Sequence, residues 1–181
     1  AIVAQQDTAG FTYFTNRDGI LQKGLEGAAR WRIYANDESI LTELIAGGSF
    51  AIQRFHYNTP DEDTHEKSLP GIPLATVSTT LDVLFRFGGF IGIQHFYNDR
   101  APLNDLNTGY SNAYHLVNAR VGVNVQRWLH KGWRFSLFLG SQNVFNAQYS
   151  GFLSINAAGG RYFNPAPPTN YYGGVTISKG F

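Results

Sequence analysis

The chain has 181 residues, enough for one domain, a formal net charge of +1 and no cysteine. No basic stripe gathers its 14 Lys and Arg, which argues against nucleic acid as a partner, and the absence of cysteine excludes disulfides and Cys-based zinc sites. Its 20 Gly, 10 Tyr and 14 Phe, beside only 15% charged residues, favour β-hairpins and membrane interfaces over a soluble helical domain. No apolar run is long enough for a transmembrane helix, but transmembrane β-strands need only about ten residues and alternate in polarity.

The first predicted strand runs from about residue 11 to residue 35 and ends at a turn over 35–39. Its side chains alternate with the period of two that is typical of a half-buried strand. The apolar face carries Leu25, Ala29, Trp31 and Ile33, and the polar face carries Glu26, Arg30 and Arg32. Residues 1–6 are expected to form the outer end of a preceding strand that runs the opposite way.

Six further stretches alternate in the same way, at 44–53, 76–87, 90–97, 117–125, 133–142 and 171–181. The clearest is 117–125, where Val117 and Val121 share one face while Asn118 and Arg120 share the other. That second face requires an aqueous neighbour. No helical period of comparable quality appears, so the sequence predicts an all-β antiparallel meander.

The predicted connections alternate strictly between short and long. Those near 36–39, 87–89 and 126–132 are short, and those over 58–73, 98–112 and 156–169 are long. Outer-membrane barrels place short turns in the periplasm and long loops outside. Trp31, Trp128 and Trp133 all fall beside short turns, where they are expected to form a periplasmic aromatic girdle. The alternative is a soluble antiparallel β-sandwich with one buried face, against which the alternating connection lengths count.

Three stretches of the sequence resemble the C-terminal part of TonB-dependent outer-membrane receptors. The most specific is 143–149, Asn-Val-Phe-Asn-Ala-Gln-Tyr, which is similar to that family's Asn-Leu-Phe-Asp-x-x-Tyr element in the penultimate strand. It is followed by an aromatic and proline-rich segment, 162–172, and by a last strand ending in Phe181. Upstream, 15–26 and 69–73 also resemble family segments, whereas Lys179 stands where an apolar or Tyr side chain is usual.

The resemblance implies that residues 1–181 are the C-terminal part of a 22-stranded transmembrane barrel, without the plug domain. Tracing strands back from Phe181 gives only about seven complete strands, so we expect a fragment of a larger barrel. The resemblance further implies a structural role for five motif residues, with Asn143 expected to satisfy backbone groups at a bend. These residues are Asn143, Phe145, Tyr149, Pro167 and Phe181.

The function implied by the resemblance is energy-dependent uptake of a ligand such as a ferric siderophore across the bacterial outer membrane. The implied partners are outer-membrane lipid, the remainder of the barrel and plug, and the TonB complex through an N-terminal part that this sequence lacks. No catalytic residue and no cofactor is expected.

Candidate ligand-binding residues lie on the predicted lumen face and in the outer loops. Arg30, Arg86 and Arg120, together with Arg32, face the lumen and are suited to an anionic chelate or to plug carboxylates, although lining a wet lumen also accounts for them. Asp61, Asp63 and His65 in the first long loop, with His56 just before it, form a cluster that suits a metal ion but is more typical of a solvated acidic loop. Tyr162 is a candidate for stacking on an aromatic ligand, against a place in the girdle.

A rival hypothesis is a self-contained barrel of about eight strands that acts as a lipid-modifying enzyme or an adhesin. It requires residues 1–16 to make a complete first strand. A deacylase also requires a serine and a histidine that meet near the outer rim, and the spacing of Ser150, His115 and Asp105 does not support a triad.

Overall fold

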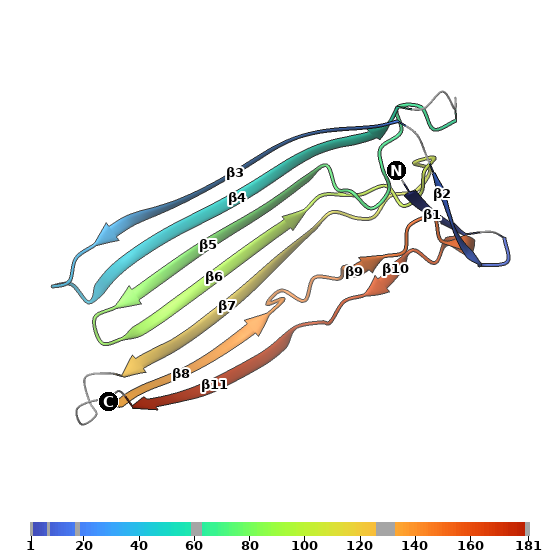
Figure 1. The fold of residues 1–181 in the computed structure, drawn as a ribbon. Coiled ribbons are helices and arrows are strands. Elements are labelled where there is room, and N and C mark those ends of the chain that lie inside the picture. Colours follow the sequence, from blue (N-terminus) through green and yellow to red (C-terminus); the bar gives the residue numbers. More distant parts are fainter. Residues whose placement is uncertain (1, 7, 17–18, 59–62, 126–132, 180–181) are drawn as a thin grey trace.

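In a computed structural model, which describes residues 2–6, 8–16, 19–58, 63–125 and 133–179, the chain is dominated by one seven-stranded antiparallel sheet. Its strands are β3 (Ile20–Ala35), β4 (Leu41–Tyr57), β5 (Ala75–Phe85), β6 (Gly89–Asn98), β7 (Tyr114–Val125), β8 (Trp133–Gln142) and β11 (Asn170–Lys179). They follow one another as a meander, with β3 and β11 at the edges, so the sheet is not closed (Figure 1). The predicted all-β meander is confirmed.

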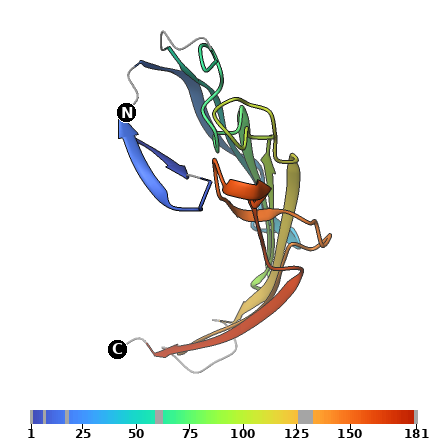
Figure 2. The ribbon, with the colours of Figure 1, turned by 90° about the vertical axis from the view of Figure 1, so that its right-hand side faces the viewer.

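Two small hairpins lie outside this sheet. β1 (Ile2–Gln6) pairs with β2 (Thr12–Asn16), and β9 (Ser150–Leu153) pairs with β10 (Phe163–Pro165). Figure 2 shows that the main sheet is curved and that the β1–β2 hairpin stands away from it on the concave side. A short 3-10 helix, η1 (Ala158–Gly160), lies between β9 and β10. Among the described residues, no helix is long and apolar enough to cross a membrane.

The prediction of one continuous strand over 11–35 is wrong. β2 ends at Asn16, β3 begins at Ile20, and Gly19 between them has a φ of 76°, in the left-handed region that strands do not use. β2 consequently pairs with β1 in a separate sheet, and neither strand joins the seven-stranded one. β9 and β10, within and beside the predicted loop 156–169, were not anticipated.

Cross-strand register assigns every strand residue to one of two faces. Ala46 pairs with Leu81, Leu81 with Ile93, Ile93 with Ala119, and Ala119 with Ser141, so the predicted apolar sets of different strands share one face, here called the apolar face. The opposite one is called the polar face. One local prediction fails, because a bulge leaves Ile33 without a ladder partner and Tyr34 pairs with Leu44 instead.

The apolar face is widely exposed. Leu25, Leu139 and Ile177 show 62%, 63% and 63% of their surfaces, and the total accessible surface is 12454 Å². A soluble globular chain of 20.1 kDa exposes only about 8,700 Å². Contiguous exposed apolar surface of this extent needs a partner that excludes water, and lipid meets that requirement.

The buried core lies at one end of the sheet, among the long connections. Tyr57, Ala101, Leu103 and Ala157 are the buried apolar residues of the described chain, and all belong to the long connections or to the strand end that enters them. The short turns at 36–40 and 86–88 lie at the opposite end (Figure 1). The third predicted short turn, 126–132, lies outside the described residues, as does Trp128. The chain therefore has a packed loop end and a sheet that is packed only edge to edge.

Candidate functional site

Two of the four candidate arginines are neutralised on the polar face. The guanidinium of Arg30 lies 3.5 Å from a carboxylate oxygen of Asp82, and that of Arg32 lies 3.5 Å from Glu43. Each pair joins neighbouring or next-neighbouring strands, so the period-two pattern that places the arginines on this face also places the acids there. These pairs are exposed, and such pairs typically contribute less than about 1 kcal/mol each.

Arg120, on β7, has a different environment. Its direct cross-strand partners are Gly92 on β6 and Gly140 on β8, so no side chain flanks it in its own row. The guanidinium carbon instead lies 4.9 Å from the ring centre of Phe90 and 5.4 Å from that of Phe138. Within the described chain, no carboxylate lies at ion-pair distance from Arg120, so its charge is held between two aromatic rings and remains open to the polar side of the sheet.

The rings beside Arg120 are seated on glycines of neighbouring strands. Phe90 pairs with Gly122, and a Cβ atom added at Gly122 would come within 2.5 Å of the Phe90 ring. Likewise, Gly140 lies under Tyr172 and Gly174 under Phe138, with corresponding distances of 2.3 and 2.7 Å. Glycine lets each ring lie over the backbone of the next strand, the packing known from aromatic rescue of glycine in sheets. The aromatic platform made of Phe90, Phe138 and Tyr172 therefore draws on β6, β8 and β11 and surrounds Arg120 on β7.

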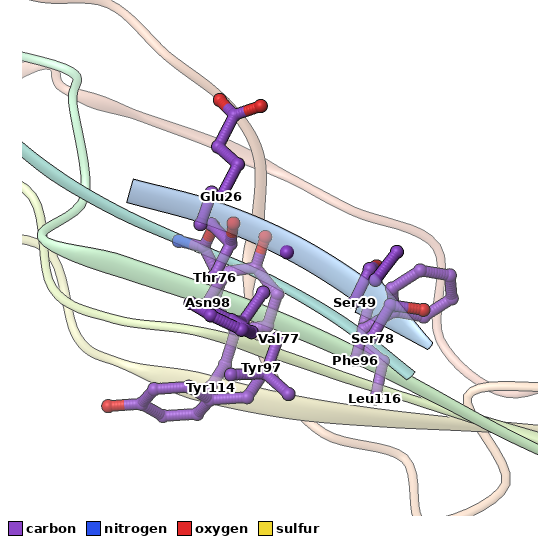
Figure 3. Close-up of a pocket in the computed structure, with 14 residues that line it drawn as sticks. Glu26, Ser49, Thr76, Val77, Ser78, Phe96, Tyr97, Asn98, Tyr114 and Leu116 are labelled. Atoms are coloured by element: carbon purple, nitrogen blue, oxygen red, sulfur yellow. The ribbon is translucent and has the colours of Figure 1, made fainter. Parts of the chain in front are cut away.

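Two hollows are lined mainly by the polar face. The smaller one, of about 380 Å³, is lined by Arg120, Phe90 and Phe138 together with Arg30 and Asp82. The larger one, of about 860 Å³, lies nearer the long connections (Figure 3). Its lining combines small side chains with the larger Phe96 and Leu116, and Figure 3 shows the side chains of Glu26 and Tyr114 well apart from each other. The small lining residues are Ala28, Ser49, Ala51, Thr76 and Ser78.

The position predicted for Arg86 needs correction. Arg86 follows β5 and lies in the turn between β5 and β6, beyond the strands that carry the other three candidate arginines. The Arg86 guanidinium donates to the backbone carbonyl of Glu38 at 3.2 Å, and the Arg86 backbone N–H donates to the backbone carbonyl of Ile40. Arg86 thus ties together two short turns.

The candidates in the outer loops are dispersed. His56 faces Ser68 across an isolated bridge, and Tyr162 packs edge-on against Phe163 with ring centres 6.5 Å apart. In the part of the chain that the structure describes, which includes Asp63 and His65, no group of three or more His, Asp or Glu side chains is placed to hold a metal ion. Asp61 lies outside the described residues.

The long connections are joined by a buried polar node. The hydroxyl of Tyr57 donates to Asp105 at 2.7 Å, and the side-chain amide of Asn156 donates to the same carboxylate oxygen at 3.1 Å. The backbone N–H of Asp105 donates in return to the Asn156 side chain at 3.0 Å. This Tyr57–Asp105–Asn156 node links the end of β4 to two long connections. Sequence reasoning missed it, because a single Asp between polar loop residues carries no periodic signal.

The same contacts bear on the enzyme hypothesis. Asp105 belongs to the node, whereas His115 lies 2.9 Å from the ring nitrogen of His95 on the apolar face. Ser150 is bound within its own hairpin, where its hydroxyl oxygen accepts from the N–H of Asn164 at 2.9 Å. Each of the three residues considered for a triad therefore has a different partner.

The 143–149 segment, which is similar to an element of the family's penultimate strand, follows β8 and does not continue it. Asn143 and Asn146 have φ values of 51° and 52°, which turn the chain out of the ladder. The buried Asn143 side chain both donates to the carbonyl of Ala147, at 2.9 Å, and accepts from its N–H, at 2.8 Å. Tyr149 packs against Tyr114 with ring centres 4.9 Å apart, while Phe145 is 76% exposed. Pro167 is exposed in the segment before β11, and Phe181 lies outside the described residues.

A comparison with protein families agrees with this architecture. The family model described as TonB dependent receptor-like, beta-barrel matches residues 1–144, about four fifths of the chain. This family comprises transporters of the outer membrane and not enzymes, and its members work with a plug and with TonB. The antiparallel meander, the exposed apolar face and the family match together show that the chain belongs to the TonB-dependent receptor β-barrel family.

Proposed function

We propose that this chain forms part of the wall and lumen of a receptor that takes up an anionic ferric chelate, such as a ferric siderophore, across the outer membrane. The observation that supports this cargo is the open charge of Arg120 between Phe90 and Phe138. A cation stacked on aromatic rings offers both charge and planar surface to an anionic, partly aromatic ligand.

The neighbouring arginines explain why Arg120 stands out. Arg30 and Arg32 each face a carboxylate at 3.5 Å, so their charges are largely compensated for an approaching anion. The remainder of the barrel and the plug would complete the lumen around this face, and the TonB complex would supply energy through the plug side of the receptor. The proposal assigns no chemical step to this chain.

The proposed function is tested with the intact receptor that carries this chain. Uptake of iron-55 is measured in cells that depend on the receptor, with a panel of anionic, neutral and cationic ferric chelates. Uptake of cobalamin labelled with cobalt-57 is measured in the same cells as a non-iron cargo. We expect energy-dependent accumulation of an anionic chelate. Accumulation of only a neutral or cationic cargo would contradict the proposal.

The role of Arg120 is tested separately. Arg120→Gln is expected to weaken binding of the transported chelate roughly 5- to 30-fold, the loss of about 1–2 kcal/mol from one charge-assisted contact. Arg120→Lys keeps the charge but loses the planar stacking, so its affinity for the chelate should lie between those of the wild type and Arg120→Gln. Arg32→Gln serves as the control, because it removes a compensated charge from the same face. Normal uptake with unchanged affinity in Arg120→Gln would remove Arg120 from the site while leaving the cargo class intact.

A further inference from the structure

On the apolar face of the sheet, at its loop end, two cations are direct cross-strand partners. Lys23 of β3 pairs with Arg54 of β4, one step beyond the apolar pair of Leu25 and Ile52. Both cations are exposed. Within the described chain, no carboxylate lies at ion-pair distance from either one.

This pairing is unfavourable for the sheet alone. The Cβ atoms of directly opposed residues are only about 5 Å apart, and like charges at that distance destabilise an antiparallel pair. Two cations without an ion-pair partner on this largely apolar face therefore indicate that an anion from outside the described chain lies between them.

The position of the pair in the membrane indicates where that anion comes from. Tyr34, the last apolar-face residue of β3 before the short turn, and Leu25 are nine residues apart, about 30 Å along the strand at about 3.3 Å per residue. At a strand tilt of about 40° this is roughly 23 Å along the membrane normal, close to the apolar band of about 25 Å in such barrels. Lys23 and Arg54 therefore lie just beyond the outer edge of the hydrocarbon layer, at the level of the lipid headgroups.

A polar hollow adjoins the pair on the same end of the sheet. It has a volume of about 700 Å³ and is lined by Arg54 and His56 of β4 and by Arg100, whose guanidinium lies 5.1 Å from the Tyr110 ring centre. Its lining also includes the carboxylates of Glu66 and Asp99, so the hollow as a whole is mixed in charge. It suits the uncharged polar part of a headgroup whose phosphate is held at Lys23 and Arg54.

We propose that Lys23 and Arg54 bind the phosphate of a phosphorylated lipid headgroup in the outer leaflet, with the remaining headgroup in the hollow beside Arg54. Leu25 and Ile52 below them, which are 62% and 46% exposed, contact the acyl chains of the same lipid. A freely diffusing anion would not account for apolar side chains directly beneath the cations. The proposal does not depend on the transported cargo.

The test uses the intact receptor in phosphatidylcholine nanodiscs doped with a phosphorylated glycolipid or with its dephosphorylated form. Retained glycolipid is counted by native mass spectrometry after gentle extraction. The Lys23→Gln and Arg54→Gln double variant is expected to bind the phosphorylated form roughly fivefold more weakly for each cation removed. The control is the Arg32→Gln and Arg134→Gln double variant, which lowers the net charge equally on the polar face and should retain the lipid.

Thermal stability provides a second readout that a purely structural effect would not reproduce. Lys23→Gln relieves the like-charge pair, so it should raise the unfolding temperature in a neutral detergent and lower it when the phosphorylated lipid is present. Lys23→Arg should behave like the wild type in both. Equal retention of the dephosphorylated form, equal loss in the control variant, displacement of the lipid by millimolar inorganic phosphate, or the absence of this crossover would each overturn the proposal.

Discussion

Replacing Tyr57 by Phe is expected to loosen the long connections while leaving the seven-stranded sheet intact. The substitution removes only the hydroxyl that donates to Asp105 at 2.7 Å, in a buried position. A buried hydrogen bond to a charged group contributes about 1.5–3 kcal/mol. Opening of the loop end should therefore become about 10- to 150-fold more frequent, because 1.4 kcal/mol corresponds to a factor of ten in the opening equilibrium.

The measurement is hydrogen exchange of the intact receptor, read by mass spectrometry on peptides from 99–113 and 154–162. Faster exchange is expected there and not in β5 or β6. Tyr97→Phe is a matched control, because the Tyr97 hydroxyl donates to Asp99 at 3.1 Å, a tyrosine–aspartate bond that spans only two residues. If Tyr57→Phe leaves exchange in both segments unchanged, or if Tyr97→Phe accelerates them equally, the node does not hold the long connections together.

Two further predictions concern the sheet and the turn after it. Gly122→Val should lower the thermal stability of the folded barrel, because the new Cβ atom would lie 2.5 Å from both the Phe90 ring and the backbone carbonyl oxygen of Leu137. Overpacking of this kind costs about 1–3 kcal/mol. Gly92→Ala is the control, because its Cβ atom would lie 3.5 Å from Asp82. Asn143→Ala should destabilise the receptor in denaturant titrations by about 2 kcal/mol or more, since it leaves both polar groups of Ala147 unpaired and puts alanine at a φ of 51°. Asn143→Gly loses the same two hydrogen bonds but relieves the backbone strain, so it should recover only a minor part of the loss. Full stability of Asn143→Gly would show that the side-chain bonds contribute little.

The seven strands could be predicted from the sequence because a strand with water on one side and lipid on the other alternates polar and apolar side chains. In 117–125, Val117 and Val121 lie on one face, and Asn118 and Arg120 lie on the other. Strand continuity was harder to predict. Gly19 sits within an otherwise alternating stretch, and whether it continues the strand or breaks it depends on a backbone angle that composition does not encode.

The environment of Arg120 was beyond the reach of sequence patterns for a related reason. Its place on the polar face follows from alternation, but its isolation depends on Gly92 and Gly140 being its partners on the two neighbouring strands. Register between strands is determined by turns and bulges, such as the one at Ile33. Alternation alone makes the four arginines equivalent, whereas the structure distinguishes two ion-paired residues, one turn residue and one residue stacked between rings.

The two faces of the sheet require different surroundings, and its two edge strands each require a further strand as a partner. β3 and β11 each pair on one side only within the described chain, and backbone groups left unpaired in lipid cost several kcal/mol each. The polar face carries the aromatic platform and Arg120, which need an aqueous lumen, and the apolar face carries Leu139 and Ile177, which need lipid. A curved sheet can meet both requirements at once only when further strands of the receptor pair with β3 and β11 and separate the lumen from the membrane.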